Sequence, residues 1–273
     1  MWNTAFAGSP GAIRHGYTIA RMESVTGYGV TEHGRRSCRR TAGAKSGLAF
    51  AAAFYLACCG APTGPTQHES RSIPRDASES LRADLRMGAG TLKVSGGSSN
   101  WMQGDFTYNV ASWKPEIRYS SSGGHGELTV EQPGSNQSHS GSTKNEWDLR
   151  LSNDIPTDLT AHMGAGEARL DLGTLSLRGL EIEMGAGELR LDLRGKPSHS
   201  YDARIRGGAG EATVYLPRDA GIYARASGGL GEIKAQGLRS DGDHWVNDAY
   251  STSKVQVRLD IQGGVGQINL IAE

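Results

Sequence analysis

The sequence is poor in cysteine, phenylalanine and proline, and these scarcities limit the folds it can adopt. Its 273 residues include only three cysteines, four phenylalanines and nine prolines. All three cysteines (Cys38, Cys58 and Cys59) precede residue 60, so no disulfide can cross-link the body of the chain. We therefore expect packing and backbone hydrogen bonds alone to stabilise the fold.

Basic charge is scarce in the body of the chain, although the formal net charge of the whole sequence is zero. Residues 1–57 hold seven Lys and Arg but only two Asp and Glu, so the remainder is mildly acidic. A surface that binds nucleic acid needs clustered basic residues. The composition therefore argues against a nucleic-acid partner.

Motifs for catalysis, cofactors and metals are missing as well. No Gly-x-Ser-x-Gly motif occurs, and the Gly-x-Gly blocks lack the third glycine and the following helix of a dinucleotide site. The histidines beyond residue 80 lie at irregular spacings that suit no metal-ligand pattern. We expect no cofactor, no metal site and no enzymatic activity. These histidines are His125, His139, His162, His199 and His244.

The N-terminal region has the pattern of a bacterial lipoprotein signal peptide. Several basic residues precede an apolar run, Gly47–Ala57, of about eleven residues, which suits a signal peptide and is too short to span a membrane. The run ends at Leu56-Ala-Cys-Cys, which resembles a lipobox with Cys59 as the lipidated residue; Cys58 fits the pattern less well. A plain signal peptide with incidental cysteines is the alternative.

The sequence predicts that the chain has three parts. Residues 1–59 form an N-terminal extension and signal peptide. Within it, residues 1–21 precede a second methionine, Met22, and are interpreted as lying upstream of the true start of translation. Residues 60–80 are rich in Pro, Ser, Thr and charge, which predicts a flexible tether. Residues 81–273 form the folded domain. Because Gly60 and not Asp follows Cys59, the pattern favours the outer membrane in a Gram-negative cell.

Glycine, with 39 residues, is abundant and recurs in a repeated block. The block reads Met-Gly-Ala-Gly-Glu in its fullest form, and its central copies are spaced 21, 23 and 21 residues apart. Such self-similarity is the signature of a repeat architecture. The second glycine of each block marks seven units at Gly90, Gly126, Gly166, Gly187, Gly210, Gly231 and Gly266.

Apolar residues alternate on both sides of the block, but the alternation slips by one residue at the glycine. Leu180, Ile182 and Met184 alternate before Gly187, and odd-numbered positions from Leu189 onwards are apolar after it. Period-two alternation indicates half-buried strands, and a fixed slip at glycine indicates a corner that keeps both strands facing one core. Each unit is therefore predicted to be strand, glycine corner, strand and turn.

Stacking of these units predicts an all-β, single-stranded β-solenoid (β-helix). One unit has too thin an apolar face to fold alone, whereas stacked units share a continuous core. A β-sandwich of hairpins is the alternative. The 21-residue repeat would stack equivalent residues of successive units on one another, and the small inward side chains suit a narrow interior. Both features favour the solenoid.

The repeated blocks resemble a known family. The segments 163–172 (MGAGEARLDL) and 184–193 (MGAGELRLDL) are similar to the bacterial toast-rack family, whose relatives include the C-terminal domain of LiaF-like cell-wall stress proteins. The resemblance extends over roughly residues 81–271 and weakens where inserts interrupt the repeat. It implies a β-helical fold, a cell-envelope location and no catalysis, and it implies no particular ligand.

A column of carboxylates follows the corners. Glu167, Glu188, Glu211 and Glu232 occupy the same place in four units, where stacking would separate neighbours by about 4.8 Å. One hypothesis is a Ca²⁺-binding ladder, because carboxylate oxygens suit a hard cation. The alternative is a solvated face whose charge is offset by Arg169, Arg190 and Lys234 on the same strands.

Aromatic residues gather in the inserts that flank the regular units. They form either a platform for carbohydrate or caps over the ends of the solenoid, and their flanking position favours caps. They are Trp101, Phe106, Tyr108, Trp113, Trp147, Trp245 and Tyr250.

Together these features predict a lipid-anchored, non-enzymatic protein of the bacterial cell envelope. Its partners would be the membrane, through the lipid anchor, and an envelope protein or glycan, in envelope stress response or adhesion. A β-helical enzyme acting on polysaccharide is the alternative, and a convergent Asp, Glu, Lys and Arg cluster in one groove would favour it. A third hypothesis is an adhesin-like module whose copies associate edge to edge.

Overall fold

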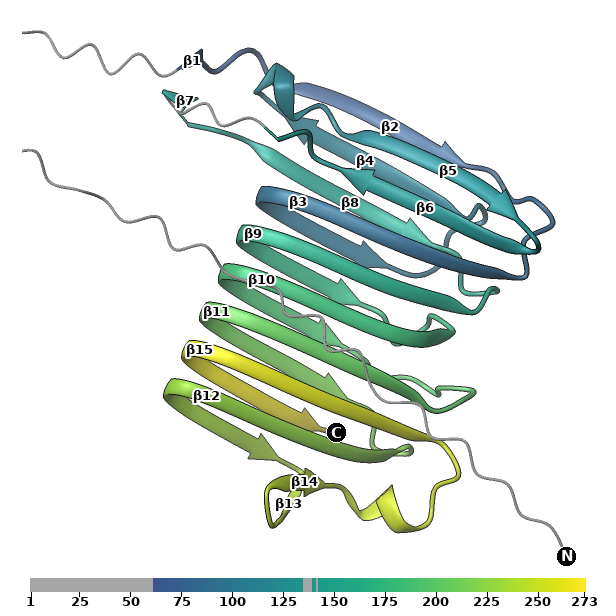
Figure 1. The fold of residues 1–273 in the computed structure, drawn as a ribbon, viewed down its shortest axis with the longest axis vertical. Helices are drawn as coiled ribbons and strands as arrows, with labels where there is room; N and C mark the ends of the chain where they lie inside the picture. Colours follow the sequence, from purple (N-terminus) through teal and green to yellow (C-terminus); the bar gives the residue numbers. More distant parts are fainter. Residues whose placement is uncertain (1–60, 135–138, 141) are drawn as a thin grey trace, which may run out of the picture. The chain divides into compact units, whose positions relative to one another are not determined.

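The computed structural model describes residues 61–134, 139–140 and 142–273. Six strands of 15 to 17 residues dominate this part of the chain, and each bends at its glycine block so that it forms two arms (Figure 1). We call the half before the bend the first arm and the half after it the second arm. The six are β3 (Ser80–Ser95), β9 (Thr157–Asp171), β10 (Leu177–Asp192), β11 (Tyr201–Leu216), β12 (Gly221–Gln236) and β15 (Gln256–Ala272).

The bent strands stack in parallel and in register. Gly187 of β10 pairs with Gly166 of β9 and with Gly210 of β11, and the residues on both sides of the bend pair in step. The first arms form one layer, the second arms form another, and a loop returns the chain from each second arm to the next first arm (Figure 1). This confirms the predicted all-β, solenoid-like fold.

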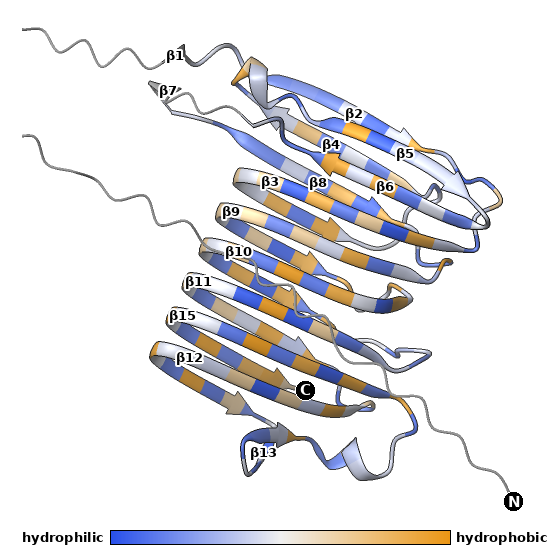
Figure 2. Ribbon diagram, viewed as in Figure 1, coloured by the Kyte–Doolittle hydropathy of each residue, from blue (hydrophilic) through white to orange (hydrophobic). Residues whose placement is uncertain are grey.

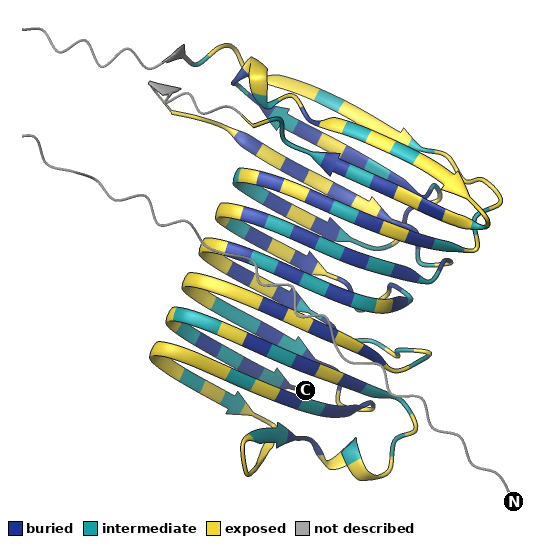
Figure 3. Ribbon diagram, in the orientation of Figure 1, coloured by how far each residue is buried: buried dark blue, intermediate teal, exposed yellow. Residues whose placement is uncertain are grey.

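The core lies between the two layers and follows the predicted parity. Leu180 and Ile182 are buried before the bend in β10, and Leu189 and Leu191 are buried after it, so the inward positions change from even to odd numbers at Gly187. Figure 2 shows the alternation of apolar and polar residues along each strand, and Figure 3 shows that it matches burial. The glycine bend therefore keeps both arms facing the same interior.

The order of the strands in the stack differs from their order in the sequence. The C-terminal strand β15 lies between β11 and β12, so β12 is the last long strand. In this order Asp260 of β15 lies between Arg204 of β11 and Arg225 of β12. Direct pairing of β11 with β12 would place the two arginines opposite each other, and like charges on facing strands destabilise a sheet.

The same insertion separates two glutamates on the second arm. Gln267 of β15 lies between Glu211 of β11 and Glu232 of β12. The inserted strand thus provides an acidic neighbour for two arginines and a neutral neighbour for two glutamates. This charge pattern gives a physical reason for the order β11, β15, β12.

Shorter strands extend both arms at the N-terminal end of the stack. On the first arm, β6 (His125–Glu131) pairs with β3 and with β5 (Glu116–Ser122). On the second arm, β3 is followed by β8 (Asn145–Leu151), β4 (Met102–Tyr108) and β2 (Gln67–Ile73). A small separate pair joins β1 (Ala61–Pro62) to β7 (His139–Ser140), and a 3-10 helix, η1, spans Ala111–Trp113.

The opposite end carries a small cap. The hairpin of β13 (Arg239–Asp241) and β14 (His244–Val246) pairs with β12 at Tyr223 and Ala224 only, and a 3-10 helix, η2 (Asp248–Ser251), follows. The described residues include no helix with the length and apolar character needed to cross a membrane.

The segment predicted as a flexible tether, 60–80, is instead largely part of the fold. Its residues 67–73 form β2, which is paired along its whole length with β4. Arg75 then contacts Ser152 at 2.9 Å and Asp154 at 2.6 Å. The composition was misleading because an edge strand needs only backbone hydrogen bonds, and polar side chains protect its free edge from unwanted pairing.

Candidate functional site

The bend is built on two glycines per strand. At Gly166 and Gly187 φ is +125° and +130°, a region that L side chains rarely adopt. A Cβ at Gly187 would also collide with the carbonyl oxygen of Gly166 in the neighbouring strand. The same positive φ recurs at the equivalent glycines of the other four bent strands, which are Gly90, Gly210, Gly231 and Gly266.

Gly126, the seventh predicted corner, does not lie at a bend. It lies inside the straight strand β6, opposite Leu81 of β3, and has no positive φ. The turn is made instead by Gly123 and Gly124, which have φ of +58° and +79° and join β5 to β6 as an antiparallel hairpin. A Gly-Gly pair between two strands is a hairpin signal, and it explains this difference.

The carboxylate column is present but interrupted. Across the stack its positions read Thr91, Glu167, Glu188, Glu211, Gln267 and Glu232, so only three glutamates are direct neighbours.

Local partners contact three of the four glutamates of this column. Arg169 donates to Glu167 at 2.6 Å, Asn269 donates to Glu211 at 2.8 Å, and Lys234 lies 3.1 Å from Glu232. The described residues contain no group of three or more His, Cys, Asp or Glu side chains arranged to hold a metal ion. The solvated-face interpretation of the glutamates fits this geometry better than a calcium ladder.

The interior beneath the bend changes character along the stack. Met87, Met163 and Met184 point inward in β3, β9 and β10 and fill it. The equivalent positions in β11, β15 and β12 are Gly207, Gly263 and Gly228. A Cβ at Gly207 or Gly228 would meet no atom within 4 Å. The methionine column therefore gives way to open space.

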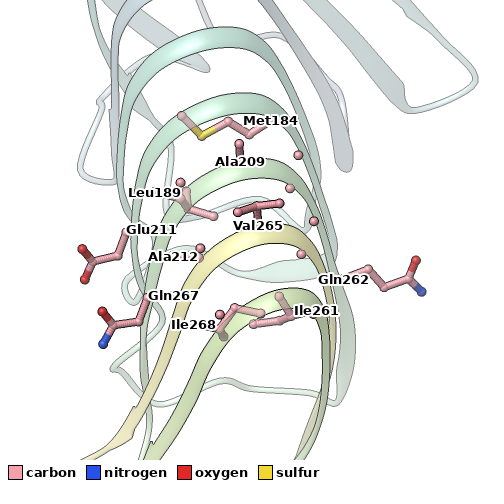
Figure 4. Close-up of a pocket in the computed structure, with 18 of the residues that line it drawn as sticks. Met184, Leu189, Ala209, Glu211, Ala212, Ile261, Gln262, Val265, Gln267 and Ile268 are labelled. Atoms are coloured by element: carbon pink, nitrogen blue, oxygen red, sulfur yellow. The ribbon is translucent and has the colours of Figure 1, made fainter.

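This space is a small apolar cavity of about 80 Å³. Figure 4 shows Met184, Leu189 and Ile268 beside it, whereas Glu211 and Gln267 point away from it. Its lining offers hydrocarbon and backbone, and its volume is close to that of one missing side chain. It has the size of a packing defect, well below the few hundred Å³ of a typical ligand pocket.

A larger, shallow groove lies on the outer side of the first arms, next to the bend. Its volume is about 800 Å³. Exposed glycines, including Gly164 and Gly185, line it alongside polar side chains. We call it the corner groove, and its polar wall consists of Arg86, Gln132, His162, Glu183 and Arg206.

Three of the polar side chains in the corner groove contact one another. Glu183 lies 3.1 Å from His162 through one carboxylate oxygen and 3.1 Å from Arg206 through the other. Arg206 also contacts Glu181 at 3.2 Å. Sequence reasoning missed this groove because its wall comes from four strands plus the residue after β6. The only signal was that each of the four strand residues lies two places before the first glycine of its block, and Gln132 carried no such signal.

A cluster of hydrogen bonds around Asp76 fixes the N-terminal end. Asp76 accepts bonds from the backbone N–H of Ser78 at 2.9 Å, from Trp101 Nε1 at 3.0 Å and from the Tyr119 hydroxyl at 2.9 Å. The bonds from Ser78 and Trp101 hold the pKa of the Asp76 carboxyl well below its ordinary value. This cluster joins the end of β2 to β4 and β5.

The aromatic residues of the inserts are mostly internal. Trp101, Phe106, Tyr108 and Trp147 are buried at the N-terminal end, where Phe106 meets Trp147 edge-on at 5.6 Å. Trp245 packs partly buried against the core at the other end. Rings placed this way cap the ends of the core, whereas a carbohydrate platform would need exposed faces. Trp113 and Tyr250 lie in the 3-10 turns.

Three further histidines each have a local partner. His125 bonds to Ser80 at 2.6 Å, His199 bonds to Ser198 at 2.9 Å, and His244 stacks on Tyr223 with ring centres 4.4 Å apart. Cys58 and Cys59, the predicted lipidation residues, lie outside the described residues, as does the rest of the predicted signal peptide.

Comparison with known families identifies the fold. The family model for the N-terminal domain of toast-rack (DUF2154) matches residues 62–215, which is more than half of the chain. The chain belongs to the toast-rack family. The match begins before β2, in agreement with the finding that residues 67–73 are part of the folded domain.

Two solved structures are similar to this toast-rack chain. A candidate cell adhesion protein from Clostridium sporogenes is 34% identical, with a TM-score of 0.74, over 77% of this chain and 100% of that one. A candidate adhesin from Bacteroides fragilis is 9% identical, with a TM-score of 0.30, over 77% of this chain and 100% of that one. No curated protein matches the chain in sequence.

Proposed function

We propose that this chain is a lipid-anchored, non-enzymatic scaffold of the bacterial cell envelope that makes adhesive contacts with a protein or glycan. The corner groove carries this proposal. It is wide, open and polar, and its exposed glycines let an extended partner approach the backbone. The similarity to a candidate cell adhesion protein at 34% identity supports an adhesive role.

The paired charges of the groove support binding in preference to catalysis. A glycoside hydrolase of the usual kind uses two carboxylates, one to donate a proton and one to act as base or nucleophile. Glu181 and Glu183 are the nearest candidates, and Arg206 contacts both of them. Both carboxylates are thus engaged by the same arginine. Wild-type protein and the Glu183→Gln variant should therefore both leave cell-wall polysaccharide intact, and product release by wild type alone would support the enzyme.

Photo-crosslinking in intact cells tests the adhesive contact. A photoreactive amino acid at His162 places the probe in the corner groove, and one at Arg190 places it on the second arm as the matched control. We expect an adduct with an envelope protein or glycan from position 162 and none from position 190. Equal labelling from both positions, or none from either, would contradict the groove as the contact surface.

The lipid anchor has its own test. Cells fed an alkyne-tagged fatty acid should label the wild-type chain and its Cys58→Ser variant, and the Cys59→Ser variant should lose the label and leave the membrane fraction. Retention of the label by the Cys59→Ser variant together with its loss from the Cys58→Ser variant would move the anchor to Cys58. A wild-type chain that takes up no label would remove the anchor from the proposal.

A further inference from the structure

The stack ends in an edge that is largely unpaired. Among the described residues, β12 pairs on its outer side only at Tyr223 and Ala224, through β14. Its segment Gly228–Gln236, which comprises the bend and the second arm, pairs with β15 on its inner side alone. A strand edge of this length presents free N–H and C=O groups to which another strand can add.

The two ends of the stack differ in how their edges are protected. At the N-terminal end the edge strand β2 is polar and carries an ion pair between Glu69 and Arg71. Charged and polar edges of this kind discourage pairing.

The edge of β12 is instead partly apolar. Leu230 is 72% exposed, and its register partner Val265 is 55% exposed; these are the large exposed hydrophobic residues of the described chain. Ile233 is only half-buried, although its partner Ile268 is buried. The core is therefore left incompletely covered along the second arm of β12.

The charges on this arm are complementary to themselves. Glu232 and Lys234 flank Ile233 and point outward, with 66% and 49% of their side chains exposed. A two-fold axis brings a strand against its own copy in antiparallel orientation. If the axis passes at Ile233, Glu232 of each copy faces Lys234 of the other. If it passes at Glu232 or Lys234, like charges face each other.

We infer that the second arm of β12 pairs antiparallel with the same arm of a second copy, with Ile233 opposite Ile233. Backbone hydrogen bonds extend the second-arm sheet across the two copies. The two reciprocal pairs of Glu232 with Lys234 set the register, and the apolar side chains of the edge become covered. This inference stands independently of the anchor and of the corner groove.

Charge reversal tests the pairing and its register. Sedimentation velocity of the full chain over a range of concentrations should show a reversible dimer. Glu232→Lys and Lys234→Glu should each weaken it by about tenfold or more, because each creates two like-charge contacts. The two single variants mixed together should form heterodimers, since the two lysines of one variant then face the two glutamates of the other.

The mixture separates this inference from a simple loss of folding. The within-chain contact of residues 232 and 234 is broken in both single variants and is not restored by mixing, whereas the contact between copies is restored. If circular dichroism shows that either variant is unfolded, hydrogen exchange of the wild-type protein replaces the charge-reversal experiment. The backbone amides of residues 228–236 should then exchange more slowly at high protein concentration than at low concentration. A wild-type chain that stays monomeric, a dimer indifferent to both reversals, or a mixture without heterodimers would each overturn the inference.

Discussion

At the scale of single residues, glycine in this chain serves two different purposes that only the structure separates. Gly187 and its equivalents are needed for their positive φ and for close approach to the neighbouring strand. Gly207 has no positive φ, and a Cβ there meets no atom within 4 Å. The first kind of glycine builds the bend, and the second leaves a space beneath the bend.

Alanine substitution of the two kinds of glycine should therefore change stability by very different amounts. Gly187→Ala should lower the free energy of unfolding by about 2 kcal/mol or more, because it combines an unfavourable φ with a backbone collision. Gly207→Ala is the control, and its stability should stay within about 0.5 kcal/mol of wild type. Urea denaturation followed by circular dichroism measures both. Equal effects at the two positions would contradict the assigned difference.

Asp76 links stability to pH at the N-terminal end. Its pKa is lowered in the folded chain by hydrogen bonds, whereas an unfolded Asp titrates near about 3.9. A depressed folded pKa adds stability that is fully present above the unfolded pKa and is lost as the pH falls towards the folded pKa. The Asp76→Asn variant should lose less stability than wild type between about pH 4 and pH 2. Parallel acid-unfolding curves for the two proteins would contradict this assignment.

At the scale of strands, the core is packed column by column, and the methionine column ends after β10. Gly207→Met should continue the column into the cavity and raise the free energy of unfolding by about 1 kcal/mol. Gly263→Met is the matched control, because a Cβ there would lie 3.2 Å from Ile268 Cδ1 and an added side chain would crowd it. Thermal unfolding should rank Gly207→Met above wild type and Gly263→Met below it. The reverse order would show that the space under β11 cannot accept a side chain.

Outward charges are matched between strands, and β15 depends on this matching. Asp260→Arg would place three arginines side by side across β11, β15 and β12, and should cost about 1 kcal/mol. Asp260→Asn removes the attraction without adding repulsion and should cost about half as much. The difference should shrink in high salt, because exposed charges are screened. Denaturation at low and high ionic strength measures it, and a difference that salt leaves unchanged would point to a packing cause.

The strands themselves could be predicted from the sequence, but their neighbours could not. The parity slip around Gly187 identified the inward residues, because the burial of alternate positions leaves a direct trace in the sequence. Placing β15 required the cross-strand pairing of Asp260 with Arg204 and Arg225, and pairing between distant segments leaves no periodic signal. The corner groove was missed for the same reason, since His162, Glu183 and Arg206 meet only after stacking.

At the scale of the whole molecule, a stack of bent strands is stabilised mainly by neighbours. Inner strands such as β9 and β10 are paired on both sides of both arms, whereas the second arm of β12 is paired on one side only. In such an architecture each strand's stability depends on its own folding and on its contacts with adjacent strands. The two ends of the stack should therefore not open equally, because the N-terminal end carries a covering of shorter strands.

Hydrogen exchange should reveal this gradient. At protein concentrations low enough to keep copies apart, the backbone amides of β9 and β10 should exchange most slowly, and those of residues 228–236 in β12 should exchange fastest among the long strands.

The Trp147→Ala variant removes a buried cap residue and should lower the free energy of unfolding by about 3–5 kcal/mol. It should speed exchange in β8, where Trp147 lies, and in β3 and β4, which pair with β8, before it affects β12. If the exchange rate instead increases by the same factor in every strand, the solenoid opens as one cooperative unit, and the nearest-neighbour description fails.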